Sequence, residues 1–175
     1  MTPATGVLST PRLLLRHLSA DDADFVLTLL NEEPFLQNIG DRGVRTREDA
    51  TAYILSGPVA CYEKFGFGLY AVESKESGEP IGICGLLKRE TLQDVDVGFA
   101  FLQKFWGRGY AYESAEAVMN YGWNTIGLKR IVAITTPKNH DSIKLLEKLG
   151  LRFEKMIQRP SHAGETALFS AEKPA

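Results

Sequence analysis

The sequence has few cysteines and little net charge, and each shortage excludes a class of protein. The two cysteines, Cys61 and Cys84, have no metal-type spacing, so we expect reduced thiols, with Cys84 in a strand core. A net charge of −2 over 175 residues gives no basic field for nucleic acid or a membrane surface. No apolar run is long enough to cross a bilayer, and MTPATGVLSTPR lacks the basic-then-apolar order of a secretion signal. We therefore expect a cytoplasmic protein that binds neither nucleic acid nor membrane.

Metal-ligating and nucleophilic clusters are also missing from the sequence. No group of His, Cys, Asp and Glu has ligand spacing, so no metal is predicted. The histidines, His17, His140 and His162, are spread along the chain, and His17 is expected to be structural or exposed. No Ser-His-Asp or Cys-His arrangement is evident. The sequence is therefore consistent with chemistry that needs no covalent enzyme intermediate.

The hydrophobic pattern predicts one mixed α/β domain, because no repeat or linker divides the chain. Strands are predicted at 12–18, 67–73, 80–87, 95–102, 130–136, 151–157 and 166–171. Helices are predicted after Ser19 and after Thr46, and over 110–126 and 139–149. Ser19 with Asp22, and Thr46 with Asp49, form capping-box signatures. Pro58 is expected to break or restart the second helix before its end near residue 65.

The most informative stretch is FAFLQKFWGRGYAYESAEAVMNYGW, residues 99–123, in which a strand pattern passes into a helix through two glycines. A helix N-terminus attracts anions, and glycine at 107 and 109 lets the backbone approach one without a Cβ in the way. Lys104 and Arg108 add positive charge, which favours a phosphate-bearing ligand. No P-loop is present, and Tyr112 stands where the dinucleotide fingerprint needs Gly or Ala. From the two glycines alone, a tight turn without a ligand explains the pattern equally well.

Three longer motifs, in the right order, resemble the GNAT acyltransferase superfamily. VDVGFAFLQKFWGRGYAYE, residues 95–113, resembles its strand and pyrophosphate loop, and WGRGYA is similar to the RimJ/RimL branch of ribosomal-protein N-terminal acetyltransferases. NHDSIKLLEKLGLRFE and TPRLLLRHLS resemble that branch's Asn-x-x-Ser helix with the following strand, and its first strand. The resemblance implies a single GNAT domain over residues 1–175, with its core at about 10–172. It also implies a mixed, mostly antiparallel sheet that splays at the cofactor site between flanking helices, and acetyl-coenzyme A as cosubstrate.

The resemblance also implies which residues bind the cofactor. They are Ala100, Phe101, Leu102, Lys104, Trp106, Gly107, Arg108, Gly109, Tyr110, Ala111 and Asn139. Amides near Ala100 and Phe101 are expected to serve as oxyanion donors and to pair with pantetheine. Trp106 could support the loop, and Asn139 could bind coenzyme A, cap its helix, or do both.

Asp96 is the predicted general base, because it occupies the place of the Glu in the family's Glu-Ile-Gly-Tyr pattern. In a strand it should share a side with Gly98 and oppose Val95 and Val97. Desolvation of a half-buried carboxylate raises its pKa, and the shorter side chain favours proton transfer through a water. The alternative is a plain surface carboxylate on the polar face of the strand.

Four positions depart from the family's pattern. Lys104 replaces Arg or Gln, and Leu102-Gln103 replaces Asp-Pro; cofactor binding is expected to survive, since main-chain amides contact the phosphates. Leu146 stands where many members have a Tyr that protonates the leaving thiolate. Ser142 is the implied substitute, with capping of its own helix as the alternative role.

The sequence leaves the acceptor open. The branch implies a primary amine, such as a protein N-terminus; a small-molecule amine and a non-catalytic coenzyme A sensor are the alternatives. His162 and Glu165 could line the acceptor site and assist proton removal, or lie in a solvated loop. Glu32, Glu33 and Asp41 give a mild acidic bias that suits a cationic amine or plain solubility. A monomer or a homodimer is expected.

Overall fold

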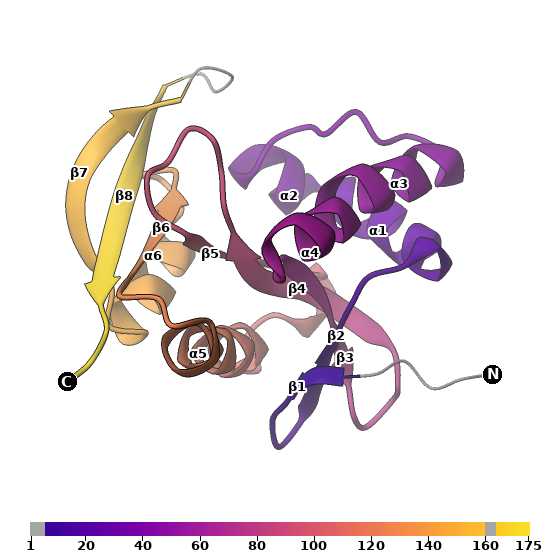
Figure 1. Ribbon diagram of the computed structural model, residues 1–175. Helices are drawn as coiled ribbons and strands as arrows, with labels where there is room; N and C mark the ends of the chain where they lie inside the picture. Colours follow the sequence, from indigo (N-terminus) through magenta and orange to yellow (C-terminus); the bar gives the residue numbers. More distant parts are fainter. Residues whose placement is uncertain (1–5, 160–163) are drawn as a thin grey trace.

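The computed structural model describes residues 6–159 and 164–175, and its frame is one mixed β-sheet (Figure 1). Within these residues the strand order is β1-β2-β3-β4-β5-β6-β8-β7. The strands are β1 (Gly6–Ser9), β2 (Leu13–Arg16), β3 (Leu69–Ser74), β4 (Pro80–Leu87), β5 (Asp96–Phe101), β6 (Arg130–Thr135), β7 (Arg152–Gln158) and β8 (Glu165–Glu172). Neighbours pair antiparallel, apart from the parallel pair β5 and β6. The mixed, mostly antiparallel sheet is as predicted.

Helices cover both faces of the sheet (Figure 1). They are α1 (Ala23–Leu30), α2 (Glu33–Asn38), α3 (Arg47–Ile54), α4 (Ala60–Phe65), α5 (Tyr110–Tyr121) and α6 (His140–Lys148). One buried cluster joins α1 and α3 to Ala71 and Ile83 of the sheet. A second cluster joins α5 to the other face, where Cys84 is fully buried and free, as expected. The site described below lies where the two clusters approach β5.

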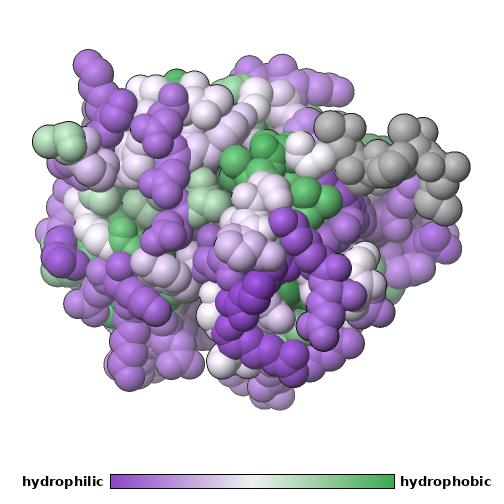
Figure 2. Space-filling view, turned by 90° about the horizontal axis from the view of Figure 1, so that it is seen from below, coloured by the Kyte–Doolittle hydropathy of each residue, from purple (hydrophilic) through white to green (hydrophobic). Residues whose placement is uncertain are grey.

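The α5 helix is amphipathic, as its apolar spacing predicts. Ala115, Val118 and Met119 are buried against the sheet, whereas Glu116 and Asn120 are exposed. The face of the molecule seen from below is largely hydrophilic, with apolar atoms in small areas between polar side chains (Figure 2). Burial of one apolar stripe therefore fixes α5, and with it the loop that precedes its first residue.

The predicted helix signals are confirmed. Ser19 and Asp22 form a capping box before α1, and Thr46 and Asp49 form one before α3. Pro58 lies inside a wide turn, Leu55–Val59, which joins α3 to α4 and accommodates a residue that has no N–H. The helical segment ends at residue 65, as predicted.

Two short elements were not predicted. β1 has only four residues, and α2 has six with Pro34 at its start and no side-chain cap. Neither is long enough to show a period of its own. Both depend on tertiary contacts: β1 pairs with β2, and Phe35 of α2 is buried in the α1–α3 cluster.

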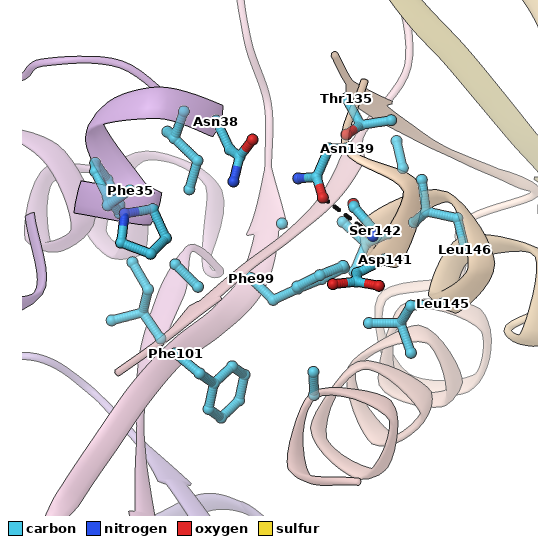
Figure 3. Close-up of a pocket in the computed structure, with 18 of the residues that line it drawn as sticks. Phe35, Asn38, Phe99, Phe101, Thr135, Asn139, Asp141, Ser142, Leu145 and Leu146 are labelled. Carbon is cyan, nitrogen blue, oxygen red and sulfur yellow. Dashed lines mark hydrogen bonds between the residues drawn. The ribbon is translucent and has the colours of Figure 1, made fainter. Parts of the chain in front are cut away.

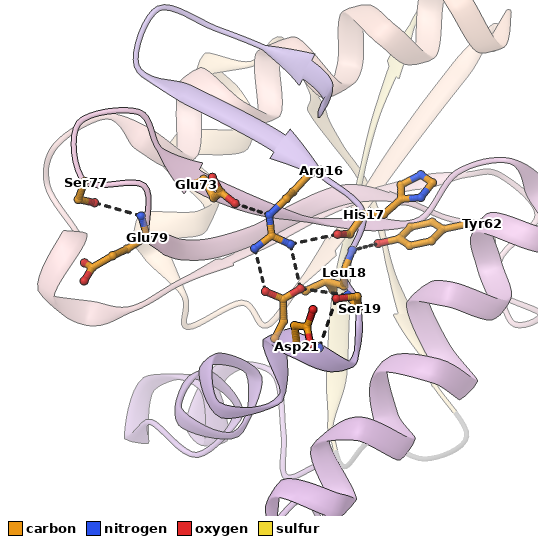
Figure 4. A network of polar contacts seen from close by, with 10 residues as sticks. Arg16, His17, Leu18, Ser19, Asp21, Tyr62, Glu73, Ser77 and Glu79 are labelled. Atoms are coloured by element: carbon orange, nitrogen blue, oxygen red, sulfur yellow. Dashed lines mark hydrogen bonds and ion pairs between the residues drawn. The ribbon is translucent and has the colours of Figure 1, made fainter. Parts of the chain in front are cut away.

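A buried ion network fixes β2 against α1 and β3 (Figure 4). Arg16 is 8% exposed and donates two hydrogen bonds to Asp22, at 2.8 and 2.9 Å, and another to Glu73. The hydrogen bonds that Arg16 donates to Asp22 are the main reason that the Arg16 pKa is raised. Next to it, His17 is exposed and stacks on Tyr62 at 4.1 Å between ring centroids. This network is structural and lies apart from the site.

The sheet splits between β5 and β6, as expected for a cofactor slot. Asp96 is in register with Val132, and the Val132 amide donates to the Val95 carbonyl at 3.0 Å. In the described residues, the ladder between these strands extends no further. β5 then continues along β4, while β6 turns toward α6 (Figure 1). The backbone of β5 beyond Asp96 therefore faces an opening on its β6 side.

Candidate active site

The loop between β5 and α5 has the conformation that its glycines predict. Gly107 and Gly109 have φ values of 77° and 81°, a left-handed region that other residues adopt at a cost. Gly109 is the N-cap of α5, so the free amides of the first helical turn lie directly after it. The turn therefore presents main-chain N–H groups and the positive end of a helix dipole to an anion.

Side chains from outside the motif support this loop. The Trp106 indole Nε1 donates to the Phe101 carbonyl at 2.9 Å, a contact that ties the loop to the end of β5. Arg12 Nη1 donates to the Arg108 carbonyl at 2.9 Å, and Arg12 Nε pairs with Glu113 at 2.7 Å. Sequence reasoning missed Arg12 and Glu113, because nothing in a single sequence connects positions that are 101 residues apart.

Backbone groups of β5 point into the split between the strands. Leu102 N donates to Ile81 O, and Ala100 is in register with Ile83 of β4. Hydrogen bonding alternates along an antiparallel strand, so the Phe99 and Phe101 amides point the other way, toward β6. The expected pantetheine and oxyanion donors are therefore Phe99 and Phe101. By the same alternation, the Ala100 amide faces β4, although its residue lines the cavity.

The α6 helix begins at the other side of the split (Figure 3). Asn139 is its N-cap, with its side-chain oxygen accepting from the Ser142 amide at 3.3 Å. The interpretation of Ser142 as the helix cap is therefore wrong, and its hydroxyl is not needed for that purpose. Ser142 is half-buried and lines the cavity, and Leu146, which lacks a hydroxyl, lies one turn further along.

Asp96 is more deeply buried than predicted. It is 1% exposed, which excludes the plain surface carboxylate. Arg89 Nε lies 3.1 and 3.3 Å from its two oxygens. Burial raises the pKa of Asp96 to about 6, and Arg89 limits the rise. The carboxylate is therefore mostly ionised at pH 7 and can still take up a proton. Arg89, which the sequence analysis missed, is its direct partner.

A single cavity of about 620 Å³ connects these features. Its wall includes Gly107, Gly109 and Asn139 at the loop end and Asp96 at the other. Figure 3 shows Phe35 and Asn38 of α2 on one side, Asn139 and Ser142 of α6 on the other, and Phe99 between them. Eight of the predicted cofactor residues line it: Ala100, Phe101, Trp106, Gly107, Gly109, Tyr110, Ala111 and Asn139. The glycine loop, the start of α6 and the Asp96 carboxylate therefore share one cavity.

Other predicted residues lie elsewhere. Leu102 is buried in the α1–α3 cluster, and the Lys104 and Arg108 cations lie over the Phe105 ring at 5.2 and 5.8 Å from its centroid. None of these three lines the cavity. Glu165 begins β8 and is exposed. His162 lies outside the described residues.

The expected acidic bias is not found at the cavity. Of the three acidic residues, Glu32 alone lines it, and its carboxylate accepts from the Gln103 amide at 2.9 Å. Asp41 is exposed and pairs with Arg45. The cavity wall also carries Arg42, Arg89 and Arg159, none of which the sequence analysis selected.

The described residues contain neither a metal-binding cluster nor a membrane-spanning helix. Among residues 6–159 and 164–175, no group of three or more His, Cys, Asp or Glu side chains is arranged to hold a metal ion. No helix in this part of the chain has the length and apolarity to span a bilayer.

Comparison with known proteins identifies the family. The profile described as an acetyltransferase (GNAT) domain matches residues 12–152. YkkB of Bacillus subtilis is 34% identical over 87% of this chain and 88% of its own length. The N-acetyltransferase YoaA of the same organism is 25% identical over 96% of this chain and 97% of its own.

Solved structures share the fold. An acetyltransferase from Agrobacterium tumefaciens has a TM-score of 0.82 and 23% identity, and covers 98% of this chain and 97% of its own. RimL, solved in complex with coenzyme A, also has a TM-score of 0.82, at 14% identity, over 96% of this chain and 98% of its own. The chain therefore belongs to the GNAT family, as an acetyl-coenzyme A-dependent N-acetyltransferase.

Proposed function

We propose that this N-acetyltransferase acetylates a primary amine by direct attack on acetyl-coenzyme A, with Asp96 as general base. The observation that carries the proposal is the continuous cavity, which joins the glycine loop to the Asp96 carboxylate. Two substrates that meet in one cavity can react without an enzyme-bound acyl group. Holding them in near-attack geometry supplies a large part of the rate enhancement.

The residues around the split fit a coenzyme A thioester. Gly107, Gly109 and the first amides of α5 would hold the pyrophosphate, since they offer donors with no Cβ between them and the anion. The amides of Phe99 and Phe101 would pair with the pantetheine arm in place of a strand. One of them would also stabilise the developing oxyanion of the thioester carbonyl.

Asp96 would remove the proton that the amine must lose. The neutral amine attacks the thioester carbonyl carbon, the C–S bond breaks, and coenzyme A leaves as its thiolate. Asp96 accepts the nitrogen proton, directly or through a water, while Ser142 donates a hydrogen bond to the thiolate. A base is most effective when its pKa is near the working pH, and a pKa of about 6 meets that condition better than an ordinary aspartate.

The acceptor proposed first is the α-amino group of a protein N-terminus, as in the RimJ/RimL branch. RimL is named for ribosomal L7/L12 as an α-N-protein acetyltransferase, and it shares the fold at low identity. A small-molecule amine is the alternative. A non-catalytic coenzyme A sensor is a further candidate, favoured by Leu146 in place of a tyrosine and by the Arg89 contact with Asp96.

The test is thiol release from acetyl-coenzyme A by the purified chain. The panel contains peptides with free N-termini, N-acetylated peptides as matched controls, and small primary amines. We expect release with some free amines and with none of the blocked peptides, and an acetyl group on the product by mass spectrometry. Tight acetyl-coenzyme A binding with no release above background for any amine would refute the proposal and support the sensor.

A further inference from the structure

Three arginines line the cavity around Arg159, and the charges of two of them, Arg89 and Arg159, reach the Asp96 carboxylate. Arg42 lies between α2 and α3, Arg89 between β4 and β5, and Arg159 directly after β7. All three line the cavity in a chain whose net charge is −2. The positive charge of these three arginines is therefore a local feature of the cavity, since the chain as a whole carries a small negative charge.

The carboxylates of the protein do not neutralise these cations. Asp96 pairs with Arg89, but no carboxylate of the described residues lies within 4.0 Å of the guanidinium of Arg42 or Arg159. Residues 1–5 and 160–163 contain no acidic side chain that could supply one. Among the described residues, Arg159 Nε is buried and has no hydrogen-bond partner. A buried guanidinium N–H is costly to leave unpaired.

The three cations also lie close enough to affect one another. The pKa of Arg159 is lowered, first by burial and then by the charges of Arg89 and Arg42, while Asp96 opposes the effect. Repulsion of this kind is relieved when an anion enters. A carboxylate is the natural partner, because a guanidinium binds it through two parallel hydrogen bonds.

We propose that Arg42 and Arg159 bind a carboxylate of the acceptor, so that the substrate is an amine with a carboxylate a few bonds away. The proposal rests on the acetyl transfer proposed above and names its substrate class. Asp96 lies beside the arginines and faces the amine of an acceptor held in this way. The same cations lower the pKa of a nearby amine, which favours the neutral, nucleophilic form.

The chemistry fits two sources of acceptor, a free amino acid and a peptide N-terminus followed by an acidic side chain. The first arm of the test compares amino acids with their carboxamides. The second compares peptides that carry glutamate at the second position with the glutamine versions. Values of kcat/KM are expressed per neutral amine, since amidation also lowers the pKa of the amine. We expect the carboxylate member of at least one arm to be preferred by about tenfold or more.

Substitutions locate the effect. Arg159→Met and Arg42→Met should each raise KM for the preferred acceptor about tenfold. The KM for its carboxamide, which lacks the carboxylate, should change much less, and the KM for acetyl-coenzyme A should stay the same. Arg159→Lys should recover part of the affinity that Arg159→Met loses, because lysine keeps the positive charge but cannot form the two parallel hydrogen bonds of a guanidinium. Arg47→Met is the matched control: Arg47 is 62% exposed and its partner Asp24 lies 3.5 Å away. Equal use of carboxylates and carboxamides, or an equal effect of Arg47→Met, would overturn the proposal.

A binding measurement separates this proposal from the proposed activity. Propionate and 3-phenylpropionate, which lack the amine, are titrated calorimetrically into the coenzyme A-loaded protein and into Arg159→Met. Binding that is lost in the variant supports the carboxylate site even if no amine is acetylated. Acetylation of amines without carboxylate preference, and without binding of these acids, would refute the site and leave the activity standing.

Discussion

Replacement of Asp96 by Asn should separate catalysis from stability. The side chain keeps its size but loses its proton acceptor, so kcat should fall by about 10²–10⁴-fold, the usual range for a general base. Because the pKa of Asp96 is about 6, a log plot of wild-type kcat/KM against pH should steepen by one unit of slope below pH 6. The variant should lack this break. Thiol release measured from pH 5 to 8.5 gives both results.

The same substitution should stabilise the fold at neutral pH. The folded-state pKa of Asp96, about 6, lies above its usual 3.8, so the protonated side chain favours folding below pH 3.8 and that contribution is lost as the pH rises through 6. Asn stays neutral throughout. With 1.36 kcal/mol per pKa unit, the variant should gain roughly 1–2 kcal/mol at pH 5 and about 3 kcal/mol at pH 8, so the gain grows as the pH rises. Urea unfolding at the two pH values measures the difference.

The matched control is Asp94→Asn. Asp94 is 33% exposed and pairs with Arg130 at 3.0 Å, outside the cavity that Asp96 lines. It should retain full activity and change stability by less than about 1 kcal/mol. Full activity in Asp96→Asn would remove Asp96 as the base. Destabilisation of that variant at pH 8, or the same change at both pH values, would refute the burial argument.

Three further substitutions test the loop and the core. Gly109→Ala places a Cβ 3.3 Å from the Arg12 guanidinium and strains a residue whose φ is 81°, so calorimetry should show weaker binding of acetyl-coenzyme A. Gly127→Ala is the control: its φ is similar and no atom lies within 4 Å of the new Cβ, so it should lower stability without changing binding. Trp106→Phe removes the bond to the Phe101 carbonyl, about 1 kcal/mol, and should raise the Kd about fivefold. Arg16→Met leaves two carboxylates unpaired and should lower the urea-unfolding free energy by about 3–5 kcal/mol. Unchanged values in these assays would contradict the contacts assigned.

Local signals made much of the fold predictable. β4 matches its predicted bounds, since the polar hairpin turn with Gly78 precedes it and a polar segment, residues 88–91, follows it. Both capping boxes mark their helices. The predictions fail where an element is too short to show periodicity, as in β1 and α2. Most other strand and helix bounds differ by a residue or two, because ends depend on pairing that the local sequence does not encode. The helix predicted over 110–126 differs more: α5 ends at Tyr121, and the chain continues in a wider helical turn over Gly122–Ile126.

The candidate site was less predictable than the fold. Sequence motifs are contiguous, so they point to the glycine loop and to Asn139 of α6, both of which line the cavity. The residues that complete the site come from separate segments, and include Arg89, Arg159 and the Arg12 support of the loop. Their roles depend on the fold bringing them together. Burial likewise depends on the whole fold. The sequence predicts that Asp96 lies in a strand, but its almost complete burial, which raises its pKa, depends on the elements packed around it.

The split in the sheet has a mechanical consequence. β5 and β6 are joined at Asp96 and Val132, and the described residues give no further register pair between them. The strands β1 to β5 and the strands β6, β8 and β7 are thus joined by hydrogen bonds at one end only, although both pack on the buried cluster under α5. A molecule bound between β5 and β6 would pair with their free backbone groups and join the two parts of the sheet along its own length. Cofactor binding should therefore make the sheet more rigid, and cofactor release should return it to its looser state.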